Sequence, residues 1–364
     1  MLHLPLRLLS CASCGSPRPA GDDADGGVLH LWSPNGHVSR KLMTAAREAG
    51  VATDGLGGGR GNRADVTVPP GGLAALAATL AAPLSAVERE AVRALFLAAG
   101  AEPTLDSMAQ VAPLGRLAAR AEVGWLDRLL AEERLISHFQ PIVTPDGRPF
   151  AVEALVRATD DDGSLIGGGR IMSAARAGDM LFAVDLAARA TAVRTAAAHG
   201  YAGRLFINFS PAAIYDPDHC LRSTVALIKA SGLPPENVVF EVGEADSLES
   251  IEHLKNILRV YRSAGFKVAL DDLGAGYASL NLLHEVRPDF VKVDMGLVRD
   301  VDTDAYKAAV LGNLLRMVRD LGIPTVCEGV ETAGEARWLA EAGADLLQGY
   351  LYGRPRAEPP AAAA

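Results

Sequence analysis

The C-terminal part of the chain alternates short apolar segments with longer amphipathic ones. Eight apolar segments end in polar residues, and they read HFQPIV, AVEALVR, LFINFS, VVFEV, VALDD, FVKVD, TVCEG and DLLQGY. Helix-like runs such as 247–264, 304–321 and 333–342 lie between them. Strands that alternate with helices predict a parallel sheet. Because eight strands occur within about 220 residues, the pattern favours a closed (β/α)8 barrel over an open sheet.

The N-terminal part shows a less regular pattern of the same kind. VLHLW predicts a strand, residues 39–49 predict a helix, and ADVTV predicts a second strand before an Ala-rich helix. Ser85 and Glu88 form a capping box, which predicts a helix that continues to Gly100. These elements together predict a small α/β module.

The patterns divide the chain into three segments. We expect the α/β module over residues 1–115, with a sensory or regulatory role, and the barrel domain over 137–358. Between them we expect a connecting helix over 116–136, because Trp125 and Leu129 lie on an amphipathic pattern there.

Seven polar residues occupy equivalent places in the predicted barrel, at or near the C-terminal ends of separate strands. They are Glu153, Asn208, Glu241, Asp271, Lys292, Glu328 and Gln348. The C-terminal strand ends of a barrel meet on one rim, so these side chains are expected to converge on a single pocket. For any one of them alone, a polar strand end that faces water is a better explanation than a functional role. Seven at matching positions predict a metal-binding site.

The segment KVALDDLGAGYASL carries the strongest part of this pattern. Its apolar residues run into two adjacent carboxylates, Asp271 and Asp272, before the turn Gly274-Ala275-Gly276. Two such charges at a strand end repel each other, so a cation is expected between them. Oxygen ligands favour magnesium, manganese or calcium over zinc or copper. The alternative is a solvated strand-to-helix turn, in which Asp and Gly are common.

Composition narrows the classes of function. The net charge of −9 at pH 7 argues against a protein that binds the backbone of DNA or RNA polymers. Four cysteines at uneven spacing do not make a disulfide framework and indicate a reducing compartment. No run is long enough to span a membrane, and Pro5 and Arg7 interrupt the short N-terminal apolar run that resembles a lipoprotein signal. We therefore expect a cytoplasmic protein.

Two N-terminal motifs leave alternatives open. Cys11 and Cys14 form half of a zinc knuckle without a second pair, so they indicate either a Zn²⁺ or redox site or two small apolar residues. The glycine-rich run from Gly55 to Gly61 resembles a phosphate-binding loop, but it lacks the Gly-Lys-Ser/Thr ending and is read as a plain loop.

Residues 138–355 resemble an EAL domain, the cyclic di-GMP phosphodiesterase family, whose fold is a TIM-like barrel. Glu153-Ala154-Leu155, followed by Arg157, carries the name of the family. The other motifs are INFS with Asn208, FEVGE with Glu241 and Glu244, DDLGAG with Asp271 and Asp272, KVD with Lys292 and Asp294, EGVE with Glu328 and Glu331, and QGY with Gln348. No cyclase motif of the GGDEF type precedes them.

The resemblance implies a role for each of these positions. Two Mg²⁺ or Mn²⁺ ions would be held by Glu153, Asn208, Glu241, Asp271, Asp272 and Glu328, with Asp271 bridging them. The residues implied in catalysis are Glu153, Glu244, Asp272, Lys292, Glu328 and Gln348. Those implied in substrate binding are Gln140, Leu155, Arg157, Asp294 and Glu331.

The activity implied is that of a cyclic-guanylate-specific phosphodiesterase. It would hydrolyse cyclic di-GMP to linear pGpG and so lower a second messenger in bacterial signalling, as a homodimer formed through the EAL domain. The alternative is a receptor that binds the dinucleotide without cutting it and signals through the N-terminal module. The family usually has DDFGTG where this chain has Leu273 and Ala275, and ITE or LTE where it has Gly243. All the implied metal ligands are kept, so we expect catalytic activity. The changed loop residues lead us to expect a weaker or regulated rate.

Overall fold

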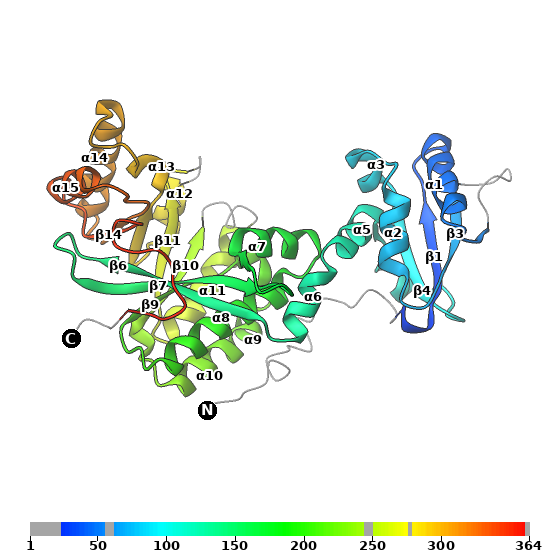
Figure 1. Cartoon of the computed structure of the whole chain (residues 1–364), viewed down its shortest axis with the longest axis horizontal. Coiled ribbons are helices and arrows are strands. Elements are labelled where there is room, and N and C mark those ends of the chain that lie inside the picture. The colour runs from blue at the N-terminus through cyan, green and yellow to red at the C-terminus, as the bar shows by residue number, and fades with distance from the viewer. Residues whose placement is uncertain (1–22, 55–61, 244–249, 276–278, 361–364) are drawn as a thin grey trace. The chain divides into compact units, whose positions relative to one another are not determined.

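The computed structural model describes residues 23–54, 62–243, 250–275 and 279–360. Among these, the chain forms two compact units, one of residues 23–132 with 170–181 and the other of 133–169 with 182–360 (Figure 1). The sequence features at Cys11, Cys14, Gly55–Gly61 and Glu244 lie outside the described residues.

The first unit is an antiparallel sheet covered by helices. Its strands follow the order β2-β3-β1-β4-β5. They are β1 Gly27–Trp32, β2 Thr53–Asp54, β3 Arg63–Val68, β4 Arg93–Ala98 and β5 Ala112–Pro113. The helices are α1 Gly36–Glu48, α2 Leu73–Ala81, α3 Ala86–Ala91, α4 Leu105–Met108 and α5 Leu114–Glu122, after a 3-10 turn at Asp23–Asp25. One core joins sheet and helices through residues such as Leu29, Phe96, Leu42 and Leu80. The small α/β module expected from the sequence is thereby confirmed.

The prediction of one helix from Ser85 to Gly100 was wrong for the second half of that range. The capping box is present, with Ser85 Oγ accepting from Glu88 N and Glu88 accepting from Ser85 N, but the helix ends at Ala91. Residues 93–98 instead form β4, an inner strand between β1 and β5. Its run of buried side chains from Ala94 to Leu97 fits a strand between two neighbours. A short apolar run does not distinguish a buried strand from a helix, and pairing with β1 decides here.

The segment between the module and the barrel also differs from expectation. Residues 116–136, expected as one helix, contain the end of α5 and a separate helix α6, Gly124–Ala131. The predicted amphipathic face is real, because Leu126 and Leu129 are buried in α6. Strand β6 already begins at Leu135.

The second unit contains a closed ring of eight strands. In order around the ring they are β6 Leu135–Val143, β14 Leu346–Gln348, β13 Thr325–Cys327, β12 Phe290–Val293, β11 Lys267–Leu273, β10 Val238–Gly243, β9 Arg204–Asn208 and β7 Pro149–Thr159. Strand β6 closes the ring by pairing with both β14 and β7, and a short extra strand, β8 Leu165–Gly167, pairs with β7. The eight predicted strands and the barrel are therefore confirmed.

One strand direction was predicted wrongly. β6 runs antiparallel to both of its neighbours, so the barrel is mixed, whereas the sequence pattern predicted an all-parallel sheet. The turn at 144–148 joins β6 to β7 directly, and two strands joined by so short a connection pair antiparallel. The other seven strands of the ring are parallel, so their C-terminal ends still meet on one rim.

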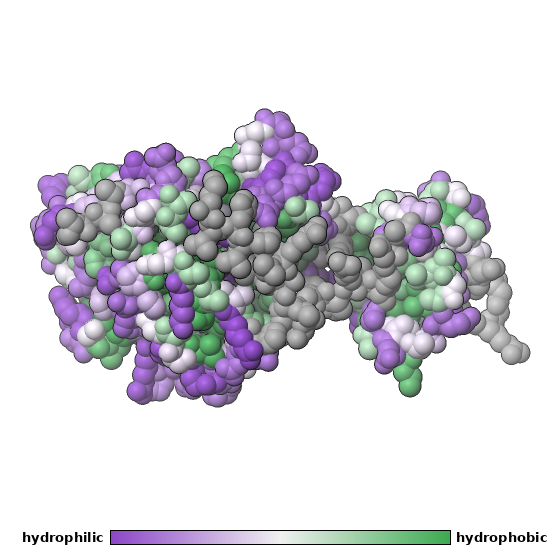
Figure 2. All heavy atoms as spheres, turned by 90° about the horizontal axis from the view of Figure 1, so that it is seen from below, coloured by the Kyte–Doolittle hydropathy of each residue, from purple (hydrophilic) through white to green (hydrophobic). Residues whose placement is uncertain are grey.

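Helices cover the outside of the ring (Figure 1). They are α8 Leu181–Ala198, α9 Pro217–Cys220, α10 Arg222–Ser231, α11 Ile251–Ser263, α12 Ser279–Val286, α13 Met295–Val298, α14 Ala305–Asp320 and α15 Ala333–Ala342, with 3-10 turns at Pro211–Ala213 and Pro235–Asn237. Helix α7, Gly168–Ala177, belongs for most of its length to the first unit. No helix among the described residues is both long and apolar enough to cross a bilayer. The space-filling view shows polar and apolar residues interspersed over the visible face (Figure 2).

Aromatic side chains fill the N-terminal end of the barrel. The Phe290 ring meets Phe206 edge-on at a centroid distance of 5.3 Å and Phe150 at 6.2 Å. The Arg204 guanidinium lies 4.6 Å from the Phe150 centroid. Since this end is packed with apolar groups, the polar side chains of the interior are confined to the opposite, C-terminal rim.

A buried ion pair ties α8 to that rim. Arg189 donates to Asp185 Oδ2 from Nε at 2.9 Å, and its Nη1 donates to Thr224 Oγ1 at 2.5 Å. The other carboxylate oxygen of Asp185 accepts from the backbone N of Ser210 at 2.9 Å. Ser210 lies two residues after Asn208, so the ion pair fixes the end of β9 next to a predicted ligand.

Removing the carboxylate of this pair should strongly destabilise the barrel. Asp185→Ala leaves the Arg189 charge buried, and breaking such a pair costs roughly 3–5 kcal/mol. Glu252→Ala, which breaks an exposed pair between Glu252 and Lys255, is the matched control and should change the unfolding midpoint little, because water screens such a pair. Urea denaturation followed by circular dichroism measures both. Equal midpoints for the two variants would contradict the role given to Asp185.

Candidate functional site

The seven polar residues at the strand ends converge, as the sequence predicted. Strand register brings three of them together first, because Asn208 is the direct partner of Glu241, and Glu153 lies on β7, the other neighbour of β9. The parallel strands β11 to β14 then add the remaining four around the rim. Most of these side chains are buried, and Glu241 is fully so.

The Lys292 ammonium lies at the centre of the group. Its Nζ is 2.6 Å from Glu328 Oε1, 2.8 Å from Glu241 Oε1, 3.1 Å from Asp271 Oδ1 and 3.4 Å from Glu153 Oε2. The Lys292 side chain is only 1% exposed. A buried ammonium is stable only where anions surround it, and the four carboxylates meet that requirement.

Amides hold the carboxylates from the side. Asn208 Nδ2 donates to Glu153 Oε1 at 2.9 Å and to Glu241 Oε2 at 2.8 Å. Gln348 Nε2 donates to Glu153 Oε2 at 2.6 Å and also lies 3.3 Å from Gln140 Oε1. Both oxygens of Glu153 are thus fixed before any ligand arrives, which reduces the reorganisation that binding requires.

The two adjacent aspartates stay close together because the strand is irregular there. The register between β11 and β12 shifts between Leu270 and Leu273, which is the signature of a bulge. Asp272 has φ of 58°, a left-handed conformation that Asp tolerates better than most residues. Asp271 is buried and Asp272 is exposed, yet one oxygen of each lies within 4.8 Å of the other. Ordinary strand alternation would have pointed the two carboxylates to opposite faces of the sheet.

The backbone at position 274, two residues after Asp272, requires a glycine. Its φ is 102°, and a Cβ there would come within 2.4 Å of Leu297 Cδ1. The turn after the aspartates therefore packs directly on α13 and its flanking residues.

Burial and mutual repulsion raise the pKa of most of these carboxyl groups. Burial is the largest cause for Glu328, whose pKa is raised to about 8. The pKa of Asp272 is raised to about 6, first by partial desolvation of its carboxyl group, although the residue as a whole is exposed, and then by the charge of Asp271. Burial likewise raises the pKa of Asp271 and lifts that of Glu241 well above its ordinary value. The site therefore holds more negative charge than it can ionise fully without cations.

Glu153 is the exception among the acids. Burial acts to raise its pKa, but the charge of Lys292 and hydrogen bonds from Gln348 and Asn208 outweigh burial, so the pKa lies below its ordinary value. The surrounding carboxylates in turn outweigh burial at Lys292 and raise the pKa of its ammonium well above the ordinary value. Both groups are charged throughout the physiological range.

The residues present fit a divalent metal ion. One oxygen from each of Asp271, Asp272 and Glu328 lies within 4.8 Å of the others. Glu241 Oε1 and Asp271 Oδ1 are buried and accept no hydrogen bond within the described part of the chain, although both are at ion-pair distance from Lys292. Four carboxylates contact the Lys292 ammonium, and a fifth, that of Asp272, lies beside two of them. All of these groups offer oxygen atoms, which suits Mg²⁺ or Mn²⁺.

A cavity of about 270 Å³ opens beside these groups. Its lining includes eight residues that the sequence singled out, namely Gln140, Glu153, Leu155, Asp271, Lys292, Glu328, Glu331 and Gln348. Met295, Arg299 and Tyr350 also line it, and sequence reasoning missed them. The missed residues follow the ends of β12 and β14 within a few positions. Because residues that follow the C-terminal strand ends lie near the pocket of a barrel, this position in the sequence could have identified them.

Some of the residues implied in substrate binding lie elsewhere or are already engaged. Arg157 and Asp294 do not line the cavity. Arg157 Nη1 donates to Val156 O at 2.7 Å, and the Asp294 side chain accepts from Gly296 N as the cap of α13. Glu331 pairs with Arg299 at 2.6 Å on the cavity wall.

Comparison with known proteins agrees with this geometry. The family model for the EAL domain matches residues 123–355, so residues 1–122 lie outside it. Among solved structures, a standalone EAL protein from Vibrio cholerae O395 in its c-di-GMP-bound form is 38% identical with a TM-score of 0.58, covering 62% of this chain and 94% of that one. The PaMucR phosphodiesterase in complex with c-di-GMP is 26% identical with a TM-score of 0.57, covering 65% and 97%.

Curated relatives show the same partial match. The blue light- and temperature-regulated antirepressor BluF of Escherichia coli is 29% identical over 60% of this chain and 53% of its own length. The probable cyclic di-GMP phosphodiesterase PdeG of the same organism is 28% identical over 63% of this chain and 46% of its own length. The chain thus spans about half the length of these relatives. With its barrel, its rim of acids and a family match over more than half of its length, the chain belongs to the EAL domain family, the cyclic di-GMP phosphodiesterase family.

Proposed function

We propose that the protein is a metal-dependent phosphodiesterase that hydrolyses cyclic di-GMP to linear pGpG. The observation that carries the proposal is the set of four carboxylates at the Lys292 ammonium, with the carboxylate of Asp272 as a fifth beside them, at an open cavity. A purely structural cluster would balance its charges, as the Asp185–Arg189 pair does elsewhere in the barrel. Excess buried negative charge costs stability and is typical of functional sites.

The proposed ligands are the residues at this rim whose side chains carry oxygen atoms. A first ion would be held by Glu153, Asn208, Glu241 and Asp271, and a second by Asp271, Asp272 and Glu328. Bound there, two divalent ions supply a water of lowered pKa and neutralise charge that develops on a phosphodiester. Asn208 suits this role because its amide nitrogen is used by two carboxylates, while its carbonyl oxygen accepts none of the described hydrogen bonds.

The chain's own residues supply position and charge. Lys292 keeps Glu153 ionised and places a fixed positive charge where a phosphate would approach. Gln348 holds Glu153 at 2.6 Å and is itself buried, so it sets the angle of that carboxylate. Fixed charges in a site that excludes water stabilise a transition state without reorganising at the moment of reaction.

The cavity wall suits a substrate with phosphates and flat bases. Arg299 presents a guanidinium, which pairs well with phosphate oxygens, and Tyr350 presents an aromatic ring. The names of PdeG and MucR relatives and the ligand in the Vibrio protein identify cyclic di-GMP as the substrate class to test first. Cytoplasmic location and dimerisation through the barrel unit belong to the same proposal.

Chromatographic separation of cyclic di-GMP and pGpG tests the reaction. The purified chain is incubated with the dinucleotide in Mg²⁺, in Mn²⁺ and in Ca²⁺. We expect pGpG with the first two ions and little with Ca²⁺, whose longer, more flexible coordination positions a water less strictly. Tight binding without product in every metal would instead favour the receptor, and the loop that carries Leu273 and Ala275 would be the first place to examine.

Two substitutions separate the two proposed metal positions. Glu153→Ala removes a ligand of the first ion and should abolish measurable turnover, whereas Asp272→Asn mainly perturbs the second. Asp272→Asn should lower kcat by roughly 100-fold or more while cyclic di-GMP binding changes little. Stopped assays give the rates, and calorimetry gives the affinity. A near-normal rate for Glu153→Ala would sink the site assignment, and equal loss of rate and binding for Asp272→Asn would reassign that carboxylate to substrate positioning.

Metal binding should release protons and strengthen as pH rises. Without metal, Glu328 has a pKa of about 8 and Asp272 of about 6, so both carry protons at low pH that a cation must displace. The affinity for Mn²⁺ should therefore increase from pH 6 towards pH 8 and level off once Glu328 is ionised. Calorimetry in buffers of different ionisation enthalpy measures the protons released. Affinity that is independent of pH, with no proton release, would contradict the proposed ligand set.

A further inference from the structure

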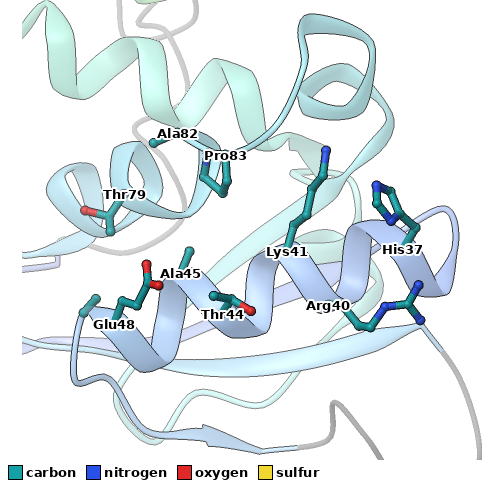
Figure 3. Close-up of a pocket in the computed structure, with 10 residues that line it drawn as sticks. His37, Arg40, Lys41, Thr44, Ala45, Glu48, Thr79, Ala82 and Pro83 are labelled. Atoms are coloured by element: carbon teal, nitrogen blue, oxygen red, sulfur yellow. The ribbon is translucent and has the colours of Figure 1, made fainter.

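A groove in the N-terminal unit lies outside the part of the chain that the EAL family model matches. It has a volume of about 750 Å³ and is lined by α1 on one side and by Thr79, Ala82 and Pro83, at and after the end of α2, on the other (Figure 3). This volume is within the range of roughly 300–1,000 Å³ found for small-molecule sites. All of its lining belongs to one unit, so its shape does not depend on how the two units are placed.

Charge is distributed unevenly along this groove. His37, Arg40 and Lys41 lie near the N-terminal end of α1, and Glu48 lies at its C-terminal end (Figure 3). Among the described residues, neither the His37 ring nor the Arg40 guanidinium has a hydrogen-bond or ion-pair partner. In a protein of net charge −9, an Arg and a His left without acidic neighbours at one end of a cavity are available to an anion.

The Lys41 ammonium is already paired with a carboxylate. Its Nζ lies 2.8 Å and 2.9 Å from the two carboxylate oxygens of Glu88, the residue that also completes the capping box of α3. This pair joins α1 to the start of α3 and so fixes one wall of the groove. The positive charge of Lys41 is neutralised by Glu88, which leaves Arg40 and His37 to meet a ligand.

The end of the helix itself is not the anion site. Asn35 caps α1, and its side-chain oxygen accepts from the backbone N of His37 at 3.0 Å and of Val38 at 3.0 Å. Two of the backbone donors that a helix offers to an anion are therefore already used. Any anion in this groove must be held by side chains.

Small residues form the rest of the lining. Ala45 of α1 and Ala49, directly after α1, lie with Ala82 and Pro83 in this part of the groove, together with the hydroxyl-bearing Thr44 and Thr79. The alanines and the proline offer contact to a flat apolar body, whereas the charged end orients the ligand. In most ligand sites, apolar contacts supply the affinity and a few polar groups fix the orientation of the ligand.

We propose that this groove binds a small organic anion, with its phosphate, sulfonate or carboxylate at Arg40 and His37 and its apolar body against Ala45, Ala49, Ala82 and Pro83. The proposal is independent of the hydrolase activity proposed for the barrel. It gives the N-terminal unit a ligand class, and it makes the unit an input site separate from the acidic rim.

Fluorescence titration with 1-anilinonaphthalene-8-sulfonate tests the proposal. The probe joins aromatic rings to a sulfonate, and it is titrated into the full-length chain and into Arg40→Gln and His37→Gln. Loss of a hydrogen bond to a charged group costs about 1.5–3 kcal/mol, so each variant should bind roughly tenfold more weakly or worse. Inorganic pyrophosphate should compete with the probe for the wild-type protein.

Arg47→Gln is the matched control. Arg47 lies on the same helix, is exposed and does not line the groove, so the substitution removes the same charge without touching the site. We expect wild-type affinity for this variant, and circular dichroism should show all the variants folded. Equal weakening by Arg40→Gln and Arg47→Gln would reduce the effect to net charge and overturn the proposal. Unchanged binding in Arg40→Gln, or no saturable binding to the wild type, would overturn it as well.

Discussion

The contact between Lys292 and four carboxylates is the constraint on which the barrel's rim depends. Each partner is costly to bury alone, and the ammonium is stable in the interior only because Glu153, Glu241, Asp271 and Glu328 surround it. The aromatic packing at the opposite end makes the contrast possible, since it removes water from one end of the ring and concentrates the polar groups at the other. The unequal number of acids and bases then leaves a demand for cations.

The same charge imbalance separates functional from structural polar groups in this chain. Asp185 and Arg189 are also buried, but they match one for one and have backbone and hydroxyl partners. At the rim, the pKa of Glu328 is raised to about 8, which marks a carboxyl group that cannot ionise comfortably as the protein stands. A stabilising network has no reason to keep such a group, whereas a site that receives divalent ions does.

Much of the barrel was predictable because its strands are apolar runs, most of which have a polar residue at or near the C-terminal end. Convergence of Asn208, Glu241 and Lys292 followed from that spacing. Strand direction did not, because β6 has the same apolar pattern whichever way it runs. The strand at residues 93–98 was also not predicted. Pairing with β1 decides between helix and strand there, and sequence periodicity does not report pairing.

Side-chain placement at the rim was predictable only in part. The backbone bulge at Asp271 and Asp272, and the use of Asp294 as a helix cap, depend on local geometry that a motif does not encode. Met295 and Tyr350 were missed because they come from segments that follow strands, where an apolar residue carries no spacing signal. The groove at Arg40 was invisible for a similar reason, because its two walls are brought together only by packing on one sheet.

Anomalous X-ray diffraction from crystals grown with Mn²⁺ would locate the metal ions in the barrel. We expect two manganese peaks at the rim, one within bonding distance of Glu153, Asn208, Glu241 and Asp271 and the other of Asp271, Asp272 and Glu328. Manganese that binds elsewhere, or a rim in which Lys292 alone holds the carboxylates at saturating Mn²⁺, would contradict this prediction.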